Sequence, residues 1–291
     1  MLKPYLDPQR MNVDLHTHTC ASDGTLSPVD LVTRAHANGV QWLAITDHDD
    51  LTSIAPARAA AAALGIGFVA GVEISVTFCD KSVHIVGLGI DETNSELVAG
   101  LIGVRAGRDA RAERMAASLE KAGIHGALAG ARAYATNPDL VSRTHFARFL
   151  VQAGVCDTTS DVFHHYLTEG KPGFVHHDWA SLRDALRWIQ AAGGVAVIAH
   201  PGRNRFNATQ RFALLSEFKD LGGAALEVVT GSHTIPQYTE YAKLCTEFGF
   251  AASRGSDFHS PTESRVDVGC LPELPASCVP VWHSCEGLLA R

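Results

Sequence analysis

Apolar runs alternate with helical patterns along most of the chain. Short runs rich in Val, Ile, Leu and Phe predict strands near residues 12–18, 40–50, 67–78, 82–90, 194–200, 224–231 and 250–257. Helical spacing of apolar residues lies between them, at 27–39, 53–65, 181–193, 207–221 and 234–248. Because the strand runs are almost continuously apolar, we expect a parallel sheet that helices bury on both faces.

Local signals support the helix boundaries. Ser27 is the expected N-cap of the first helix, Pro28 occupies its first position and Gly39 ends it. The residues "CDK" between the runs at 67–78 and 82–90 are typical of a turn.

The alternation stops between residues 95 and 170. One long helical pattern covers 95–123, two further helical segments cover 142–154 and 159–170, and the next strand is expected at "KPGFV", 171–175. We therefore expect an α/β fold whose barrel is formed by residues 1–94 and 171–291, with 95–170 as a helical insertion that caps the substrate.

Composition and charge narrow the class of protein. The chain of 291 residues is 46% hydrophobic and 19% charged, as expected for a globular protein. The N-terminus lacks the apolar segment of a secretory signal, no run is long enough to span a membrane, and the seven cysteines form no C-x-x-C pair. We therefore expect a cytoplasmic protein with reduced thiols.

The formal net charge of −7 argues against general coating of nucleic acid. Residues 101–150 nevertheless hold eight Lys and Arg against four acids. A basic segment on an acidic body indicates either an anionic ligand held between them or an ordinary solvated helix face.

Histidines and acids gather at the carboxyl ends of the predicted strands, which meet at one mouth of an α/β barrel. The residues are His16, His18, Asp47, His48, Glu73, His84, His200, Asp257 and His259. A single histidine at a strand end is more often a hydrogen-bonded core or surface residue. The pairs His-x-His and Asp-x-His are different, because residues i and i+2 of a strand point to the same side.

This set of side chains predicts a metal centre. Imidazole and carboxylate groups without thiolate suit Mn²⁺, Zn²⁺ or Fe²⁺ and do not resemble a closed structural zinc site. The donors outnumber the needs of one ion, so at least two ions are expected.

Seven segments of the chain carry a wider resemblance: "DLHTHTCASDGTLSP", "AITDHD", "GVEIS", "VHIVGLGID", "SRTHFARFLV", "AHPGR" and "GSDFH". Through them the sequence resembles the PHP (polymerase and histidinol phosphatase) family from about residue 12 to 260. Within that family it is similar to the bacterial group of nucleoside 3′,5′-bisphosphate phosphatases and short-RNA 5′ exonucleases. The resemblance implies a distorted (β/α)₇ barrel with two or three divalent ions, often Mn²⁺, with Zn²⁺, Fe²⁺ or Mg²⁺ as alternatives.

The resemblance also implies which residues hold each ion. His16, His18 and Asp257 would hold the first. Glu73 would bridge it to a second, held by His84 and His145, and Asp23, His48 and His259 would hold the third. His145 enters through the resemblance alone, and His200 corresponds to a position near the substrate, outside the ligand set.

Such a centre favours hydrolysis of a phosphate ester by a metal-bound hydroxide. No G-x-S-x-G or Walker sequence offers another mechanism. The catalytic candidates are Asp23 and His200, the latter as general acid for the leaving 3′-oxygen. Candidates for substrate binding are Arg143, Lys171, His177 and Arg203, for phosphate, and Tyr134, for stacking on a base.

The expected reaction is removal of the 3′-phosphate from a nucleoside 3′,5′-bisphosphate, for example adenosine 3′,5′-bisphosphate to AMP and phosphate. A 5′-to-3′ exoribonuclease on short RNA, a histidinol phosphatase and a non-catalytic PHP module are the alternatives. An amidohydrolase ranks lower, because that superfamily usually joins its metals with a carboxylated lysine and no lysine occupies a strand end. We expect a small phosphorylated nucleotide as partner, with short RNA as the alternative, and neither a membrane nor a stable protein partner.

Overall fold

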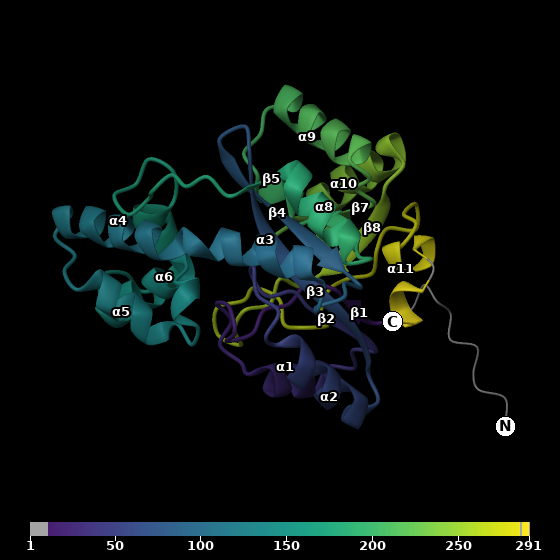
Figure 1. Cartoon of the computed structure of the whole chain (residues 1–291), viewed down its shortest axis with the longest axis horizontal. Coiled ribbons are helices and arrows are strands. Elements are labelled where there is room, and N and C mark those ends of the chain that lie inside the picture. The colour runs from purple at the N-terminus through teal and green to yellow at the C-terminus, as the bar shows by residue number, and fades with distance from the viewer. Residues whose placement is uncertain (1–10, 286, 291) are drawn as a thin grey trace.

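The structure, a computed structural model, describes residues 11–285 and 287–290. Its centre is an almost closed, barrel-shaped sheet with the strand order β1-β2-β3-β4-β6-β7-β8 (Figure 1). The strands are β1 Val13–Asp14, β2 Trp42–Ile45, β3 Gly67–Phe78, β4 Lys81–Leu88, β6 Val195–Ile198, β7 Ala225–Thr230 and β8 Ala251–Gly255. The short strand β5, Ala180–Ser181, pairs with β3. Backbone hydrogen bonds such as that from Leu15 N to Arg254 O (3.0 Å) connect the two ends of the sheet. This architecture confirms the predicted barrel.

The sheet is mixed, so the expectation of a purely parallel sheet was wrong. β3 and β4 form an antiparallel hairpin, and β4 also runs antiparallel to β6. Cys79 and Asp80 form the hairpin turn, with φ of 47° and 60°. Two consecutive residues with positive φ give a turn whose twist matches that of the flanking strands. The antiparallel hairpin brings residues of β3 and β4 together at the barrel mouth.

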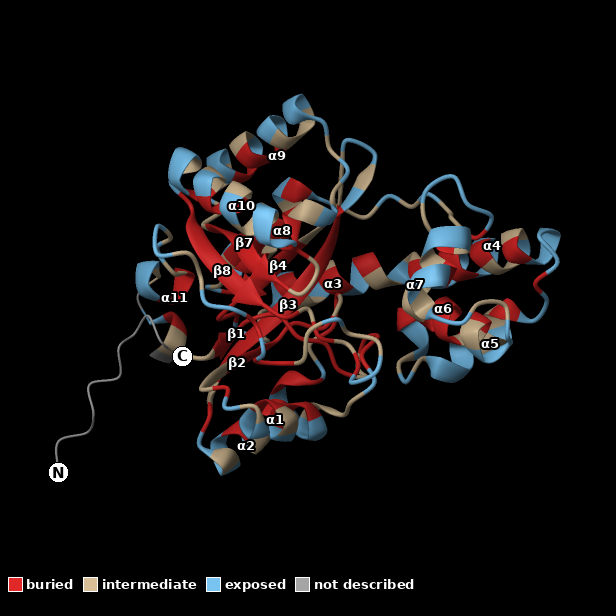
Figure 2. Ribbon diagram, turned by 180° about the vertical axis from the view of Figure 1, so that it is seen from behind, coloured by how far each residue is buried: buried red, intermediate tan, exposed pale blue. Residues whose placement is uncertain are grey.

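The barrel helices occur where the sequence predicts them. They are α1 Pro28–Ala37, α2 Ile54–Leu64, α8 Leu182–Ala191, α9 Ala208–Asp220 and α10 Ile235–Phe248. Ser27 caps α1 by accepting a hydrogen bond from Asp30 N, as predicted. Each of these helices has one buried and one exposed face, and the strands of the sheet are almost entirely buried (Figure 2).

The helical segment between β4 and β5 projects from one side of the barrel (Figure 1). Its helices are α3 Ser95–Ala106, α4 Arg108–Lys121, α5 Ala127–Tyr134, α6 Arg143–Gln152 and α7 Thr159–Val162, which a π-helical turn extends. The expected single helix over 95–123 is broken at Gly107, and α5 was not predicted. Residues 171–175 are irregular, so the strand expected there was wrong.

The helices of this segment pack in two different hydrophobic cores. Leu97 and Leu101 of α3 pack in the core of the barrel helices, whereas Met115, Phe146 and Leu150 belong to a separate core. We call the part of the chain built around that second core, α4 to α7, the cap. The domain boundaries at 94 and 170 stay a prediction.

The C-terminal segment closes the barrel at the end opposite the strand carboxyl ends. Trp282, in α11 (Val281–Ser284), and Leu288 pack against inward-facing residues such as Val13 and Leu15. Among the described helices, none combines the length and hydropathy that crossing a lipid bilayer requires.

Candidate metal centre

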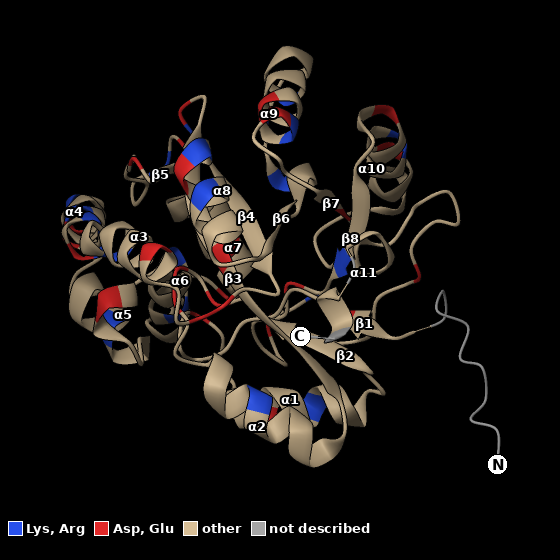
Figure 3. Cartoon of the chain, turned by 45° about the vertical axis from the view of Figure 1, so that its right-hand side comes forward, with Lys and Arg blue, Asp and Glu red and all other residues tan. Residues whose placement is uncertain are grey.

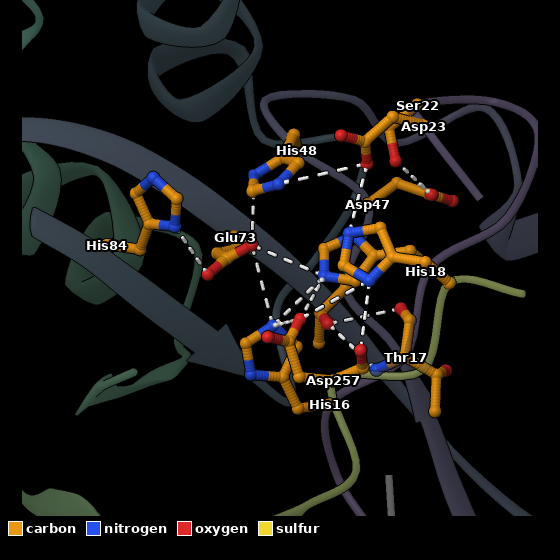
Figure 4. Close-up of polar contacts among 12 residues, drawn as sticks. His16, Thr17, His18, Ser22, Asp23, Asp47, His48, Glu73, His84 and Asp257 are labelled. Atoms are coloured by element: carbon orange, nitrogen blue, oxygen red, sulfur yellow. Dashed lines mark hydrogen bonds and ion pairs between the residues drawn. The ribbon is translucent and has the colours of Figure 1, made fainter. Parts of the chain in front are cut away.

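Side chains from the segments that follow β1, β2 and β8 meet Glu73 of β3 and His84 of β4 at one mouth of the barrel (Figure 4). At the centre, His16 Nε2 lies 3.0 Å from His18 Nε2. Both nitrogens also lie 3.3–3.5 Å from Glu73 Oε2 and from Asp257 Oδ1. His16, His18 and Glu73 are fully buried. The structure therefore brings together the residues expected for the first ion, with Glu73 beside them.

Neighbouring charges shift the pKa values of these buried groups. Burial disfavours the charged forms, but Asp257 and Glu73 outweigh it and raise the pKa of His18 to about 10. Burial likewise opposes ionisation of Glu73, yet His48, His84 and His16 hold the pKa of its carboxyl well below the usual range. The carboxylates thus require positive charge at this point.

A divalent cation fits this donor set. Glu73 Oε2 and Asp23 Oδ1 are buried and accept no hydrogen bond from described residues, and buried ring nitrogens of His18, His48 and His200 likewise have no such partner. Unsatisfied buried acceptors are rare in folded proteins and point to an ion or water. Neutral imidazole and carboxylate are also the ligands that Mn²⁺, Fe²⁺ and Zn²⁺ share.

Glu73 connects the centre to a second group. Its Oε2 lies 2.9 Å from His48 Nδ1, and its Oε1 lies 2.8 Å from His84 Nδ1. The antiparallel hairpin explains this meeting, because Glu73 on β3 and His84 on β4 lie close in its register. His48, Glu73 and His84 offer donor atoms within 4.8 Å of one another.

A third group lies beside His18. Asp23 Oδ1 is 3.2 Å from His259 Nε2 and 3.8 Å from His48 Nε2. The rings of His18 and His259 stack with centroids 4.1 Å apart. Asp23, His48 and His259, the residues expected for the third ion, therefore meet at one position, together with His18.

His200 lies in the cluster itself, although the resemblance implied a position outside the ligand set. Its Nε2 lies 3.0 Å from Glu73 Oε1, and it offers a donor atom near those of His16 and Asp257. Burial and the charge of Arg203 lower the pKa of His200 to about 3. An imidazole with so low a pKa carries no proton to give at neutral pH, so this placement favours a metal ligand over the general acid assigned above.

His145, in contrast to His200, lies outside the cluster. It lies at the start of α6, buried, and its Nδ1 accepts a hydrogen bond from Ser142 N at 3.1 Å. The carbonyl of Ser22 is within hydrogen-bonding range of the ring as well. Among the described groups with donor atoms within 4.8 Å of one another, none includes His145. It thus fastens the cap to the loop that carries Asp23, and the structure does not bring it to Glu73 and His84.

Three buried carboxylates that were not assigned to an ion, Glu227, Asp47 and Asp49, support the residues of the cluster and the loops around it. Glu227, in the middle of β7, lies 2.7 Å from His16 Nδ1 and accepts a hydrogen bond from His200 N at 2.5 Å. A lone acid within the apolar run "AALEVVTG" was a signal that could have identified it.

Asp47 and Asp49 organise the loops around the centre. Asp47 accepts hydrogen bonds from Thr19 N (2.7 Å), Ser22 Oγ (2.5 Å) and Ser53 Oγ (2.5 Å), which orders the loop leading to Asp23. Asp49 accepts a hydrogen bond from Ser75 N (2.9 Å) and pairs with Arg108 of the cap.

The backbone is strained at the same place. Asp49, His200 and Asp257 have φ values of 51°, 26° and 54°. Residues other than glycine seldom adopt this region, and such strain concentrates at functional sites.

The four candidates for phosphate binding lie in different parts of the structure: at the mouth of the barrel, at the start of α6 and in the segment after the cap. Arg203 donates to Asp257 Oδ2 at 2.8 Å and so lies at the mouth. Arg143 begins α6 with its guanidinium 5.8 Å from the ring of Phe163, and its charge interacts with those of Asp23 and Arg203. His177 packs against Trp179 with ring centroids 4.2 Å apart. Lys171 is an exposed residue of the loop after the cap.

Tyr134 lies in the wall of a groove of about 650 Å³. α5 and α6 form one side of this groove, and the residues after Asp23 and His259 form the other. Tyr134 is 37% exposed and donates a hydrogen bond to Gln152 at 2.9 Å. The assignment of these side chains to substrate binding stays a prediction.

Similar proteins are known for almost the whole chain. A 3′,5′-nucleoside bisphosphate phosphatase from Chromobacterium violaceum is 48% identical over 96% of this chain and 98% of its own length. A 5′-3′ exoribonuclease from Haemophilus influenzae is 42% identical over 93% of this chain and 97% of its own length.

Two solved structures share the fold. One, described as an amidohydrolase from Chromobacterium violaceum with bound sulfate and no metal, has a TM-score of 0.92 at 48% identity and covers 95% of this chain and 96% of its own. The other, from Bifidobacterium adolescentis and assigned as a metal-dependent phosphoesterase, has a TM-score of 0.79 at 27% identity and covers 94% of each chain. A family model for the PHP domain matches residues 14–199. The chain therefore belongs to the PHP domain family.

Proposed function

We propose that this protein is a metal-dependent phosphoesterase that removes the 3′-phosphate from nucleoside 3′,5′-bisphosphates, converting adenosine 3′,5′-bisphosphate to AMP and phosphate. One observation carries the proposal: His16 Nε2 and His18 Nε2 lie 3.0 Å apart, and each of them lies within 3.5 Å of both Glu73 Oε2 and Asp257 Oδ1. The similarity to the Chromobacterium violaceum phosphatase over nearly the full length supports this substrate class.

The cluster has donors for two or three divalent ions, and we propose manganese. We assign His16, His18, Glu73 and Asp257 to the first ion and Asp23, His48 and His259 to the third. To the second we assign Glu73 with His84 and His200, whose ring nitrogens lie 2.8 Å and 3.0 Å from Glu73 Oε1. Bound there, such ions supply activation of water and neutralisation of charge on the phosphoryl group. This assignment replaces His145 by His200 as a ligand.

The chain's own side chains orient the substrate. Arg203 at the mouth offers a planar fork that suits a phosphate, and Arg143 adds positive charge from the cap. The cap helix α6 lies over the loop that carries Asp23, where Ser142 Oγ donates to Asp23 Oδ2 at 3.0 Å. We propose that the cap limits access of bulk water to the bound phosphate.

A 5′-to-3′ exoribonuclease acting on short RNA is the second candidate. The similarity to the Haemophilus influenzae enzyme supports it, and the groove beside Tyr134 offers room for more than one nucleotide. We also propose that the protein acts in the cytoplasm, where free thiols such as those of Cys79 and Cys156 persist.

One assay separates the two candidates. The protein, loaded with Mn²⁺, is given adenosine 3′,5′-bisphosphate or a 5′-phosphorylated oligonucleotide, and the release of phosphate and of nucleoside monophosphate is measured. Faster release of phosphate from the bisphosphate supports the first function, and faster release of nucleoside monophosphate from the oligonucleotide supports the second. Hydrolysis of histidinol phosphate alone would contradict both.

A further inference from the structure

Arg111, on the first turns of α4, is a buried cation without an anionic partner. Its residue is only 6% exposed. Within the described part of the chain no carboxylate pairs with it, and the one hydrogen bond found is a long one, from its Nε to the carbonyl of Val175 at 3.5 Å. Two neighbours on the cap differ, because Arg108 pairs with Asp49 and Arg148 with Glu263.

The surroundings of Arg111 are aromatic and basic. Its guanidinium lies 5.2 Å from the ring centroid of Trp179, which also contacts His177. Burial, followed by the charges of Arg143, Arg108 and Arg114, lowers the pKa of Arg111 to about 9. Burial, followed by the charges of Arg111, Arg108 and Arg114, lowers the pKa of His177 to about 4, so this ring is neutral at neutral pH. Basic positions on α4 are visible in Figure 3.

A buried, unpaired guanidinium is unfavourable unless an anion compensates it. The flat face of Trp179 holds the fork in one orientation, which leaves its N–H groups available to a ligand. The position therefore suits a compact oxyanion, and phosphate matches both the charge and the fork.

Arg108 relates this position to the metal centre. Its guanidinium lies 4.6 Å from the centroid of the same Trp179 ring, and it pairs with Asp49, the residue that follows His48. The charge of Arg143 in addition interacts with that of Arg111 and with those of Asp23 and Arg203. These arginines thus extend from the mouth of the barrel into the cap. A substrate with two phosphates can place one at the metal centre and the other beside the cap arginines.

We propose that Arg111, held by Trp179 and assisted by Arg143, forms a subsite for the phosphate that is not hydrolysed, the 5′-phosphate of the nucleotide. The inference rests on the proposed function and deepens it, since it names the group by which the enzyme distinguishes a 3′,5′-bisphosphate from a 3′-monophosphate. Arg111 acts in specificity and does not touch the reacting atoms.

The test compares Arg111→Met with the matched control Arg114→Met, which removes an exposed charge from the same helix. The ratio of kcat/KM for adenosine 3′,5′-bisphosphate to that for adenosine 3′-monophosphate is measured with Mn²⁺. Because a charge-assisted pair is lost, we expect the ratio to fall about tenfold to a hundredfold in Arg111→Met. It should change less than about threefold in Arg114→Met, because an exposed charge is screened. Equal ratios in wild type and Arg111→Met, or equal losses in both variants, would overturn the subsite.

A second measurement keeps the subsite separate from catalysis. Titration calorimetry of AMP into metal-free protein should show weaker binding to Arg111→Met than to Arg114→Met, and intermediate binding to Arg111→Lys, which retains the charge but not the fork. If wild-type protein hydrolyses neither nucleotide, the proposed function fails while this titration still tests the subsite. Equal AMP affinity in all four proteins would refute the subsite. Arg111→Lys also serves if Arg111→Met does not fold.

Discussion

Glu227 Oε1 lies 2.7 Å from Nδ1 of His16, and both side chains are buried. The other oxygen of Glu227 accepts a hydrogen bond from His200 N. Because both oxygens are acceptors, Nδ1 of His16 carries the hydrogen, and Nε2 presents its lone pair to the cluster. A single carboxylate thus orients one proposed ligand, His16, and holds the backbone of another, His200.

Replacement of Glu227 by Gln should weaken metal binding. An amide offers one acceptor and one donor, so it cannot accept from both His16 and His200 N. We expect the affinity for Mn²⁺, measured by titration calorimetry, to fall about tenfold to a hundredfold. The control is Glu240→Gln, since Glu240 lies on the surface of α10 and pairs with Arg211 of α9. Equal Mn²⁺ affinity in Glu227→Gln and wild type would show that Glu227 does not position His16.

Removal of metal, or of Asp257, should abolish hydrolysis. Chelation should remove the activity and Mn²⁺ should restore it, because the donor cluster requires cations to act on a phosphate. Asp257→Asn should lower kcat by at least about a hundredfold, because it removes a carboxylate that we assign as a ligand of the first ion. Asp220→Asn, at the end of α9, is the control. Full activity after exhaustive chelation would contradict the mechanism.

Variants at His200 and His145 should differ in metal content. His200→Ala removes a donor beside Glu73, so elemental analysis should find fewer bound ions per chain than in wild type. His145→Ala should retain the ions but lose about 1–2 kcal/mol of unfolding free energy, because it breaks a helix-capping hydrogen bond. The reverse pattern, with ions lost only in His145→Ala, would restore His145 as the ligand.

The stability of the metal-free protein should depend on pH through His145. Burial, opposed by the charge of Asp23, lowers the pKa of this imidazole from 6.5 to about 4. The unfolded chain therefore binds a proton at higher pH than the folded protein, and stability is lost as the pH falls from 6.5 towards 4. We expect His145 to account for about 2–3 kcal/mol of that loss near pH 4.5.

His145→Gln isolates this contribution, because Gln retains an acceptor and a donor but does not titrate. Urea unfolding near pH 7 and near pH 4.5 should show a smaller loss in the variant than in wild type. Parallel losses in both proteins would mean that the protonation of His145 is not linked to folding.

The sequence determined the strands, the barrel helices and most of the centre. Helix caps such as Ser27 act within a few residues, and the paired ligands of His16 with His18 and of Asp257 with His259 follow from the alternation of a strand. These relationships are local, so they can be seen without knowing what lies beside each element. The convergence of strand ends at one mouth then follows from the barrel itself.

Only the tertiary structure decided which single histidine joins the cluster and which acids support it. In the sequence, both His145 and His200 were candidates for a position beside the ions. In the structure, His145 caps α6, whereas the antiparallel hairpin and the positive φ at His200 bring His200 beside Glu73. Glu227 stands out in the sequence as an acid within an apolar run, but its contact with His16 joins residues more than 30 positions apart, as does the contact of Arg111 with Trp179. Which residues meet over such distances depends on how the sheet and the cap pack, and no local pattern encodes it.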